Sequence, residues 1–391
     1  MSLTERLQPL FDHLPEEQRA ARAAFWQRLR DEGFPSKKHE RWRFTDLPGA
    51  LPDALHPAEP AQLTLPDVEG CRRIAFINGA AEGVDANELR TEPAASVHDA
   101  SDLVNAALAS TGLHWVPGTA STPLHLCTRT TTGSVHLRHR IEVPPQVQAQ
   151  LYWDDVVEGD ADFVTQSLEI TLAEGASLVL ARKHANTARG PALLRTDARL
   201  ARDAQLQLTG FDAGSALSRH NLHVRLDAGG AQAQVHGVFA PWAQGHIDTF
   251  ATVEHAAADT GSRLQFRGLG MDKGVGVLTG RVHVHRDAQR IDSNQQLGSL
   301  LLSPRAQINA KPELEIYADD VQCAHGNAIG QIDQDALYYL QTRGVPYAEA
   351  RALLIGAYAA ETLHIPAMPA VEKALMAGLD RALAHADWSL T

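Results

Sequence analysis

The short stretch EGASL at residues 174–178 decides the architecture of this chain, because related stretches recur further along. RDAQL follows at residues 202–206 and GGAQA at residues 229–233, so the central alanines are 28 and then 27 residues apart. RDAQ at residues 286–289 lies about two more such periods further on, with its alanine 57 residues beyond the third one. A fixed period of this length is typical of solenoids, in which each repeat forms one coil.

Around these stretches, from about residue 122 to residue 332, the apolar residues follow a period of two. Residues 168–172 alternate apolar and polar side chains, and residues 222–226 do the same. This alternation predicts strands, and each repeat then consists of a strand, a short turn around a small residue, and a strand. We therefore predict a mainly β core built as a β-helix. A β-sandwich whose hairpins resemble one another is the alternative.

Helical patterns flank this β block. Residues 15–32 predict an amphipathic helix with Ala24, Phe25 and Leu29 on one stripe. Ser101 is placed to cap a further helix before the β block begins. These patterns predict a helical N-terminal region rather than an extension of the sheet.

Three helices are predicted after the β block. Asp333 can cap the first, and Gly344 suits its C-terminal end. Pro346 fits the first turn of the second helix, and Pro369 precedes the third. The second helix should bury an apolar stripe made of Ala350, Leu353, Leu354, Ala357 and Tyr358. The third has apolar residues at four-residue spacing, namely Val371, Leu375, Leu379 and Leu383.

A chain of 391 residues is too long for one ordinary compact core, and the patterns divide it into three regions. A helical and extended N-terminal region is predicted over residues 1–112. The β-helix core follows over residues 113–332, and the C-terminal helical module over residues 333–391.

Composition limits the class of protein. There are 47 acidic and 35 basic residues, and the net charge of −12 argues against nucleic acid as a partner. No apolar stretch reaches the ~18 residues that a membrane span needs, and the N-terminus lacks the apolar core of a signal peptide. The cysteines, Cys71, Cys127 and Cys323, are odd in number and far apart, as in a reducing compartment. We therefore expect a cytoplasmic protein without a membrane partner.

Cys323 and His325 are the strongest candidates for chemistry. On a strand they point to the same face, roughly 6.5–7 Å apart along the chain. A thiolate and an imidazole on one face can bind a soft or borderline metal such as iron. Because iron–sulfur clusters usually take four protein ligands, the others would have to come from a second chain at an interface. The structural alternative is a buried cysteine and a hydrogen-bonded histidine.

Weaker metal signals come from two histidine pairs. His283 and His285 would share a strand face, whereas His220 and His223 would not. The acidic pair at residues 319–320 could mimic the two carboxyl groups of a glycosidase, but neighbours on a strand face opposite ways.

The glycine-rich residues 268–274 do not form a Walker A loop, because no Gly-Lys-Ser/Thr is present and no helix follows. We expect a turn between coils there. G-x-S-x-G and H-E-x-x-H motifs are also absent from the sequence. Without a complete catalytic constellation, the sequence favours a scaffold or interaction role over an enzyme.

Residues 311–326, which read KPELEIYADDVQCAHG, resemble the signature of the SufB/SufD family. The resemblance continues through LYYL at residues 337–340 and ARALLIGAY at residues 350–358. Weaker agreement at residues 41–45, RWRFT, and at residues 76–79, FING, extends it over essentially the whole chain.

Within this family the chain resembles the SufD type. SufB-type chains are generally longer and carry a glutamate-rich stretch where this chain has CAHG at residues 323–326. They also carry a scaffold cysteine in the strand that reads NQQL at residues 294–297 here. A SufB-type paralogue is the alternative within the family. Outside it, the alternatives are a polysaccharide-active β-helix enzyme, which is usually secreted, and a passive homo-oligomeric scaffold without a metal.

The resemblance implies a right-handed parallel β-helix flanked by helices, which pairs with SufB through the β-helix and binds the SufC ATPase through the C-terminal helices. ATP-driven closure of two SufC subunits would then expose the cluster-building site. Cys323 and especially His325 would face SufB and help to hold a transient iron–sulfur cluster shared between the two chains. Some complexes of this kind bind a reduced flavin, whose site the sequence does not place. A homodimer in isolation stays open.

Overall fold

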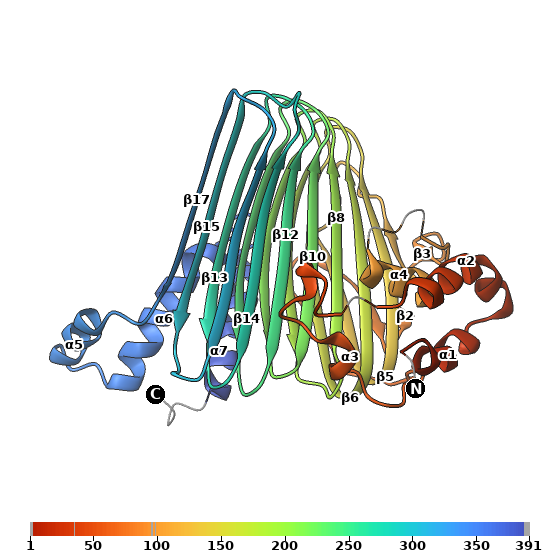
Figure 1. Cartoon of the computed structure of the whole chain (residues 1–391), viewed down its shortest axis with the longest axis horizontal. Coiled ribbons are helices and arrows are strands. Elements are labelled where there is room, and N and C mark those ends of the chain that lie inside the picture. Colours follow the sequence, from red (N-terminus) through yellow and green to blue (C-terminus); the bar gives the residue numbers. More distant parts are fainter. Residues whose placement is uncertain (1–2, 35, 95–96, 98, 387–391) are drawn as a thin grey trace.

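The structure, a computed structural model, describes residues 3–34, 36–94, 97 and 99–386. Strands stacked side by side occupy the middle of the molecule, and helices lie towards both ends (Figure 1). The N-terminal helices lie near the first coils, and α5 projects from the opposite end. Among the described residues, no helix is long and apolar enough to cross a membrane.

From β5 onwards, successive strands alternate between two parallel sheets. The odd sheet consists of β7 (Ser177–Asn186), β9 (Gln205–Gly214), β11 (Gln232–Pro241), β13 (Gly261–Gly270), β15 (Ile291–Leu301) and β17 (Val321–Gly330). The even sheet consists of β8 (Ala192–Leu200), β10 (Leu217–Leu226), β12 (His246–His255), β14 (Val275–Val284) and β16 (Gln307–Ile316). The long strands β5 (Leu124–Val143) and β6 (Gln148–Leu172) contribute to both sheets.

Two strands and two turns therefore make one coil, and about seven coils form a parallel β-solenoid. The predicted β-helix is confirmed. A β-sandwich is excluded, because its sheets are antiparallel whereas each strand here pairs in parallel with the strand one coil away.

The alanines of the sequence repeat lie in the turns that lead into the odd sheet. Each is fully buried: Ala176, Ala204, Ala231 and Ala288. The neighbouring Gly175 and Gly230 have φ of 64° and 78°, and Asp203 takes the same conformation at 54°. The repeated turn thus needs a residue that tolerates the left-handed region, followed by a small side chain that stacks on the next coil.

Inward side chains of the two sheets form the main apolar core. Leu178 lies beside Leu206 in the odd sheet, and Leu172 and Leu226 flank Leu200 in the even sheet. All five are buried. Fully burying a leucine contributes about 1.5–3 kcal/mol, so these columns of apolar side chains hold successive coils together.

The C-terminal helices are α5 (Gln334–Thr342), α6 (Tyr347–Leu363) and α7 (Pro369–His385). The predicted cap of α5 is confirmed, because the Asp333 carboxylate accepts from the backbone N–H groups of Asp335 and Ala336. The predicted apolar face of α7 is also confirmed. Its Leu375 and Leu379 are buried in one cluster with Phe211 of the odd sheet. Helices α6 and α7 therefore cover part of the outer face of that sheet.

The buried face of α6 differs from the predicted stripe. Ile355, Ala359 and Leu363 face the odd sheet and are buried. Leu353, which was predicted to be buried, is 53% exposed, and Ala357 is exposed as well. Both sides of this helix are apolar, so periodicity alone allows two orientations. Packing against the sheet selects one and leaves the other apolar side at the surface.

The N-terminal region contains α1 (Leu3–His13), α2 (Glu16–Glu32), η1 (Glu40–Trp42), α3 (Leu47–Ala50), β1 (Arg72–Ile77), β2 (Ala80–Glu82), β3 (Leu89–Arg90), α4 (Ala100–Leu108) and β4 (Gly112–Trp115). The predicted helix α2 is confirmed, but it buries Trp26 and Leu29 rather than Ala24. Asp99, not Ser101, caps α4, because its carboxylate accepts from two backbone N–H groups.

Candidate functional site

Cys323 and His325 lie on β17, the last strand of the odd sheet. In the register with β15, Cys323 lies beside Ser293 and His325 beside Gln295. Ser293 and Gln295 are 2% and 0% exposed, so this side of β17 faces the interior of the solenoid. Cys323 packs partly buried against the apolar core, whereas His325 is exposed. Both candidate ligands therefore lie on the last coil, at the open end of the solenoid.

The last coil is uncovered at its outer edge. Within the residues that the structure describes, β17 pairs only with β15 and β16 only with β14. Most residues of β17 are exposed, including the apolar Ile329. An edge strand with unpaired backbone groups is a template for pairing with another chain. Cys323 and His325 therefore lie where a second chain could complete the coil.

The surroundings of Cys323 favour a protonated thiol. Burial, and then the nearby carboxylate of Asp292, raise the pKa of the Cys323 thiol. Its sulfur is not part of a disulfide. Because the thiolate is the form that ligates metals, a metal ion bound by Cys323 would displace this proton.

A line of buried polar groups leads to Cys323 from the preceding coils. His255 Nε2 lies 2.9 Å from Ser262 Oγ, which lies 2.8 Å from Ser293 Oγ, next to Cys323 in the register. Burial lowers the pKa of His255 to about 4, so its ring is neutral at physiological pH. No sequence motif predicts this line, because Ser262 and Ser293 belong to different coils.

Gln295 is an unusual buried residue beside His325. Among the described residues, neither its amide oxygen nor its amide nitrogen has a hydrogen-bond partner. The side chain extends towards Gly280 of the facing sheet, where an added Cβ would lie only 1.7 Å from Gln295 Nε2. A buried unpaired amide is costly, and such groups are uncommon in native proteins. Its position makes Gln295 a candidate partner for His325.

A second group of metal-ligating side chains is buried near the first coils. One atom each from His125, Cys127 and Asp154 lies within 4.8 Å of the other two. However, Asp154 already pairs with Lys183 Nζ and Arg129 Nη2, each at 2.6 Å. Burial alone would raise the pKa of Asp154, but the nearby His125, at 3.9 Å, and these two cations hold it well below its usual range. A further cation is disfavoured beside two others, so the group is best explained as an ion-pair cluster.

The interior of the solenoid also contains a Ser-His-Asp arrangement. Ser218 Oγ lies 2.9 Å from His184 Nε2, and His184 Nδ1 lies 2.6 Å from Asp155 Oδ2. All three are buried, and Asp155 also accepts from Thr128 and Gln166. The arrangement has the contacts of a catalytic triad but no exposed hydroxyl for a substrate to reach, so it serves to satisfy polar groups inside the core.

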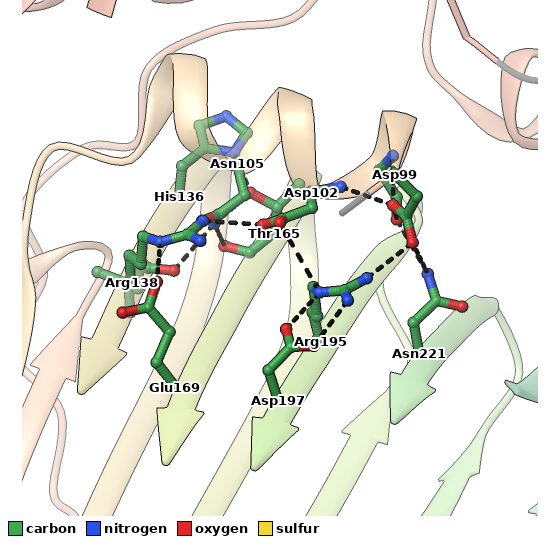
Figure 2. Close-up of polar contacts among 12 residues, drawn as sticks. Asp99, Asp102, Asn105, His136, Arg138, Thr165, Glu169, Arg195, Asp197 and Asn221 are labelled. Carbon is green, nitrogen blue, oxygen red and sulfur yellow. Dashed lines mark hydrogen bonds and ion pairs between the residues drawn. The ribbon is translucent and has the colours of Figure 1, made fainter. Parts of the chain in front are cut away.

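Charged residues fasten α4 to the outer face of the even sheet (Figure 2). Arg138 donates to Asp102 and to Glu169, each at 2.8 Å. Arg195 donates to Asp99 at 2.7 Å, so the residue that caps α4 also binds the sheet. Because both guanidinium groups are almost fully buried, this network fixes the N-terminal region on the solenoid.

The two histidine pairs singled out in the sequence are arranged differently in the structure. His220 faces the interior, where it lies 3.0 Å from Thr196 Oγ1 and burial lowers its pKa. His223 lies on the outer face of the even sheet. His283 and His285 share that face as predicted, with ring centroids 4.9 Å apart. The turn predicted over residues 268–274 is confirmed for residues 271–274, which connect β13 to β14, whereas residues 268–270 belong to β13.

The C-terminal helices present a second exposed apolar surface. On α5, Tyr338 and Tyr339 are 70% and 57% exposed, and on α6, Tyr347 and Leu353 are 50% and 53% exposed. A mainly apolar groove between α6 and α7 adjoins them. Its lining includes Tyr347, Ala352, Ile355, Leu383 and Ala384. Apolar surface of this kind commonly binds another protein.

Comparison with known proteins assigns the chain to a family. The family model described as SUF system FeS cluster assembly, SufBD core domain, matches residues 126–358, more than half of the chain. The iron–sulfur cluster assembly protein SufD of Escherichia coli is 27% identical over an alignment of 367 positions, which covers 86% of each chain. A SufBD family protein of Synechocystis is 25% identical over an alignment of 378 positions, which covers 84% of this chain and 83% of the relative. The SufD protein of Bacillus subtilis is 31% identical over 114 residues, 29% of this chain and 26% of the relative. The resemblance that the sequence motifs indicated is thereby confirmed: the chain belongs to the SufBD family of the SUF system, which assembles iron–sulfur clusters.

Proposed function

We propose that this chain is a SufD-type, non-catalytic subunit that pairs with a SufB-type chain, binds the SufC ATPase and contributes to cluster assembly at the interface of the pair. The placement of Cys323 and His325 on an uncovered edge strand is the observation that carries this proposal. The relatives named SufD support the choice of type. The role would be carried out in the cytoplasm, where cysteines such as Cys71, Cys127 and Cys323, all free in the structure, stay reduced.

Pairing would occur at the end of the solenoid formed by β16 and β17. A second β-helix placed there could hydrogen-bond to both edge strands and cover the exposed Ile329. In isolation the same edge would serve for a homodimer. In the pair, a SufB-type chain would supply the cluster ligands that this chain lacks.

The cluster would be cargo shared by the two chains. Cys323 and His325 offer one sulfur and one imidazole, which is half of the four ligands that a cluster usually takes. Neutral imidazole is a competent iron ligand, and a hydrogen bond from the neighbouring chain or from Gln295 would fix its tautomer. A reduced flavin in the assembled complex stays a prediction without an assigned site.

The ATPase would bind the exposed apolar surface of α5 and α6. Because α6 also packs on the odd sheet, which contains β15 and β17, a movement of α6 would reach the strands beneath the proposed cluster site. One contact between α6 and the odd sheet joins Tyr358 to Arg267 of β13. The Arg267 guanidinium lies 5.2 Å from the centroid of the Tyr358 ring. This contact connects the proposed ATPase site with β13, which pairs with β15, the neighbour of the edge strand.

The test is His325→Ala in the complex assembled with the SufB-type and SufC chains. Low cluster content after anaerobic reconstitution with iron and sulfide, together with normal subunit stoichiometry and thermal stability, is expected. His364→Ala is the matched control, because His364 is also exposed and lies on the C-terminal region. Normal cluster content in the His325 variant would defeat the ligand role. Loss of the complex itself would show that His325 is structural.

A further inference from the structure

We propose that His223, Glu254 and His285 form a binding site for a divalent transition-metal cation on the outer face of the even sheet. The site lies on a different face from Cys323 and His325, which are on the inward side of β17, and it does not depend on the proposed assembly role. It unites one member of each histidine pair that the sequence singled out with a carboxylate that the sequence did not.

Both imidazoles already contact the same carboxylate. His223 and Glu254 come from β10 and β12, and His285 directly follows β14; these three strands are neighbours in the even sheet. Glu254 Oε2 lies 2.9 Å from His223 Nε2, and Glu254 Oε1 lies 2.6 Å from His285 Nε2. The carboxylate is thus shared between the two imidazole rings, which approach it from different coils.

Two imidazoles and one carboxylate suit iron(II), cobalt(II) or zinc. In the metal-free chain each Nε2 contacts a carboxylate oxygen. On metal binding, Nε2 would coordinate and its proton would be held on Nδ1 of the same ring. His223 Nδ1 lies 3.7 Å from the Asp197 carboxylate, which could accept that proton in a hydrogen bond. Asp197 also accepts hydrogen bonds from Arg195, which hold its carboxylate close to His223.

The site is accessible to solvent. The side chains of His223 and His285 are 30% and 37% exposed, so both rings can shift to close on an ion. The Glu254 side chain is only 16% exposed. A partly desolvated carboxylate between two imidazoles attracts a cation.

His283 can serve as a fourth group. Its ring lies edge-on to that of His285, and its Nδ1 lies 2.8 Å from Glu315 Oε2. The Glu315 carboxylate thus leaves Nε2 of His283 available in the tautomer that ligates metals. A water molecule could otherwise complete the coordination.

Arg225 would compete with a metal ion for the Glu254 carboxylate. Its guanidinium contacts Glu254 Oε1 and also donates to Asp227 at 2.6 Å. A metal ion would displace Arg225 from Glu254, and Asp227 would keep the guanidinium paired. The His125 group differs, because two almost fully buried cations occupy its only carboxylate.

The test is a titration of the full-length chain with Co²⁺ alone, followed by calorimetry and by visible absorption. One saturable site with d–d bands and no thiolate-to-cobalt charge-transfer band is expected. His285→Gln should weaken binding by at least about tenfold, since it removes a ligand. Arg225→Gln should strengthen binding, because it removes the competing cation. His364→Gln, which alters another imidazole–carboxylate pair, should leave the affinity unchanged.

Absence of saturable Co²⁺ binding would overturn the proposal. So would an affinity that His285→Gln leaves intact, or a thiolate band that Cys323→Ser removes, because the ion would then bind at the edge strand. Neither partner chains nor clusters enter this experiment. A negative result therefore leaves the proposed function standing, and failure of the proposed function leaves this site testable.

Discussion

Gln295 lies beside His325 in the register between β15 and β17, and the first is fully buried while the second is exposed. The amide of Gln295 makes no hydrogen bond within the described residues. The last coil thus combines an unsatisfied buried group with an adjacent exposed imidazole. Stability alone does not account for a polar residue at this position, since an apolar side chain would fill it at lower cost.

Gln295→Leu should therefore separate stability from function. We expect the free energy of unfolding of the isolated chain to stay the same or to rise by about 1–3 kcal/mol, because a buried unpaired amide is removed. If Gln295 orients His325, the cluster content of the assembled complex should fall in the same variant. Urea unfolding and iron and sulfide analysis would measure the two effects.

Leu297→Ala is the control on the same strand. Leu297 is also buried and faces the core, so its truncation should cost about 2–5 kcal/mol. A Gln295→Leu variant that loses as much stability as this control would show that Gln295 has partners beyond the described contacts.

Ile329→Lys should weaken pairing with a SufB-type chain without unfolding the subunit. Ile329 is 44% exposed on the edge strand, so a lysine there costs the isolated chain little but places a charge in the proposed interface. We expect the dissociation constant of the pair to rise by about tenfold or more. Val116→Lys, at an apolar residue 52% exposed outside the last coil, should leave pairing intact. Equal binding by both variants would place the interface elsewhere.

Leu353→Asp should abolish co-purification of the SufC ATPase. Leu353 is half exposed on the side of α6 that faces away from the odd sheet, so the substitution should leave the melting temperature nearly unchanged. Deleting the helices would be a poorer test, because Leu375 and Leu379 cover Phe211 of the sheet. Retention of the ATPase by the Leu353 variant would argue against this surface as its binding site.

The solenoid could be predicted because each repeat is recognisable from a few adjacent residues. Ala176, Ala204 and Ala231 recur at nearly constant spacing, and each becomes a buried residue in the turn of one coil. The cap at Asp333 could be predicted for the same reason, since an N-cap acts on residues two and three positions ahead. The orientation of α6 could not, because Leu353 and Ile355 are equally apolar and only the sheet decides which is buried.

The site residues depend on which coils are neighbours. Cys323 and His325 were identifiable because they are two residues apart on one strand. His223, Glu254 and His285 are not local, but their spacing of 31 and 31 residues is close to the length of one coil. Superimposing the sequence on its own repeat could therefore have suggested this group. Gln295 gave no comparable signal, since being unpaired is a property of the folded interior.

Buried histidines predict how stability depends on pH. Burial lowers the pKa of His136 to about 3 and those of His139 and His255 to about 4. In the unfolded chain each would titrate near about 6.5. As the pH falls below that value, the unfolded state binds protons that the folded state does not, so the stability present at neutral pH is lost on acidification.

For His255 alone this loss should reach about 2 kcal/mol between pH 7 and pH 5. His255→Gln removes the titrating ring, while the amide can still bond to Thr260 and Ser262. The free energy of unfolding of the variant should therefore depend less on pH. Near pH 5 its unfolding should take up about one proton fewer than that of the parent chain, even if the variant is less stable at pH 7. Urea unfolding at several pH values would measure this slope.

His364→Gln, at an exposed histidine, should keep the slope of the parent chain. An unchanged slope in the His255 variant would mean that His255 is already protonated in the folded chain, and would contradict a neutral ring at the start of the polar line to Cys323.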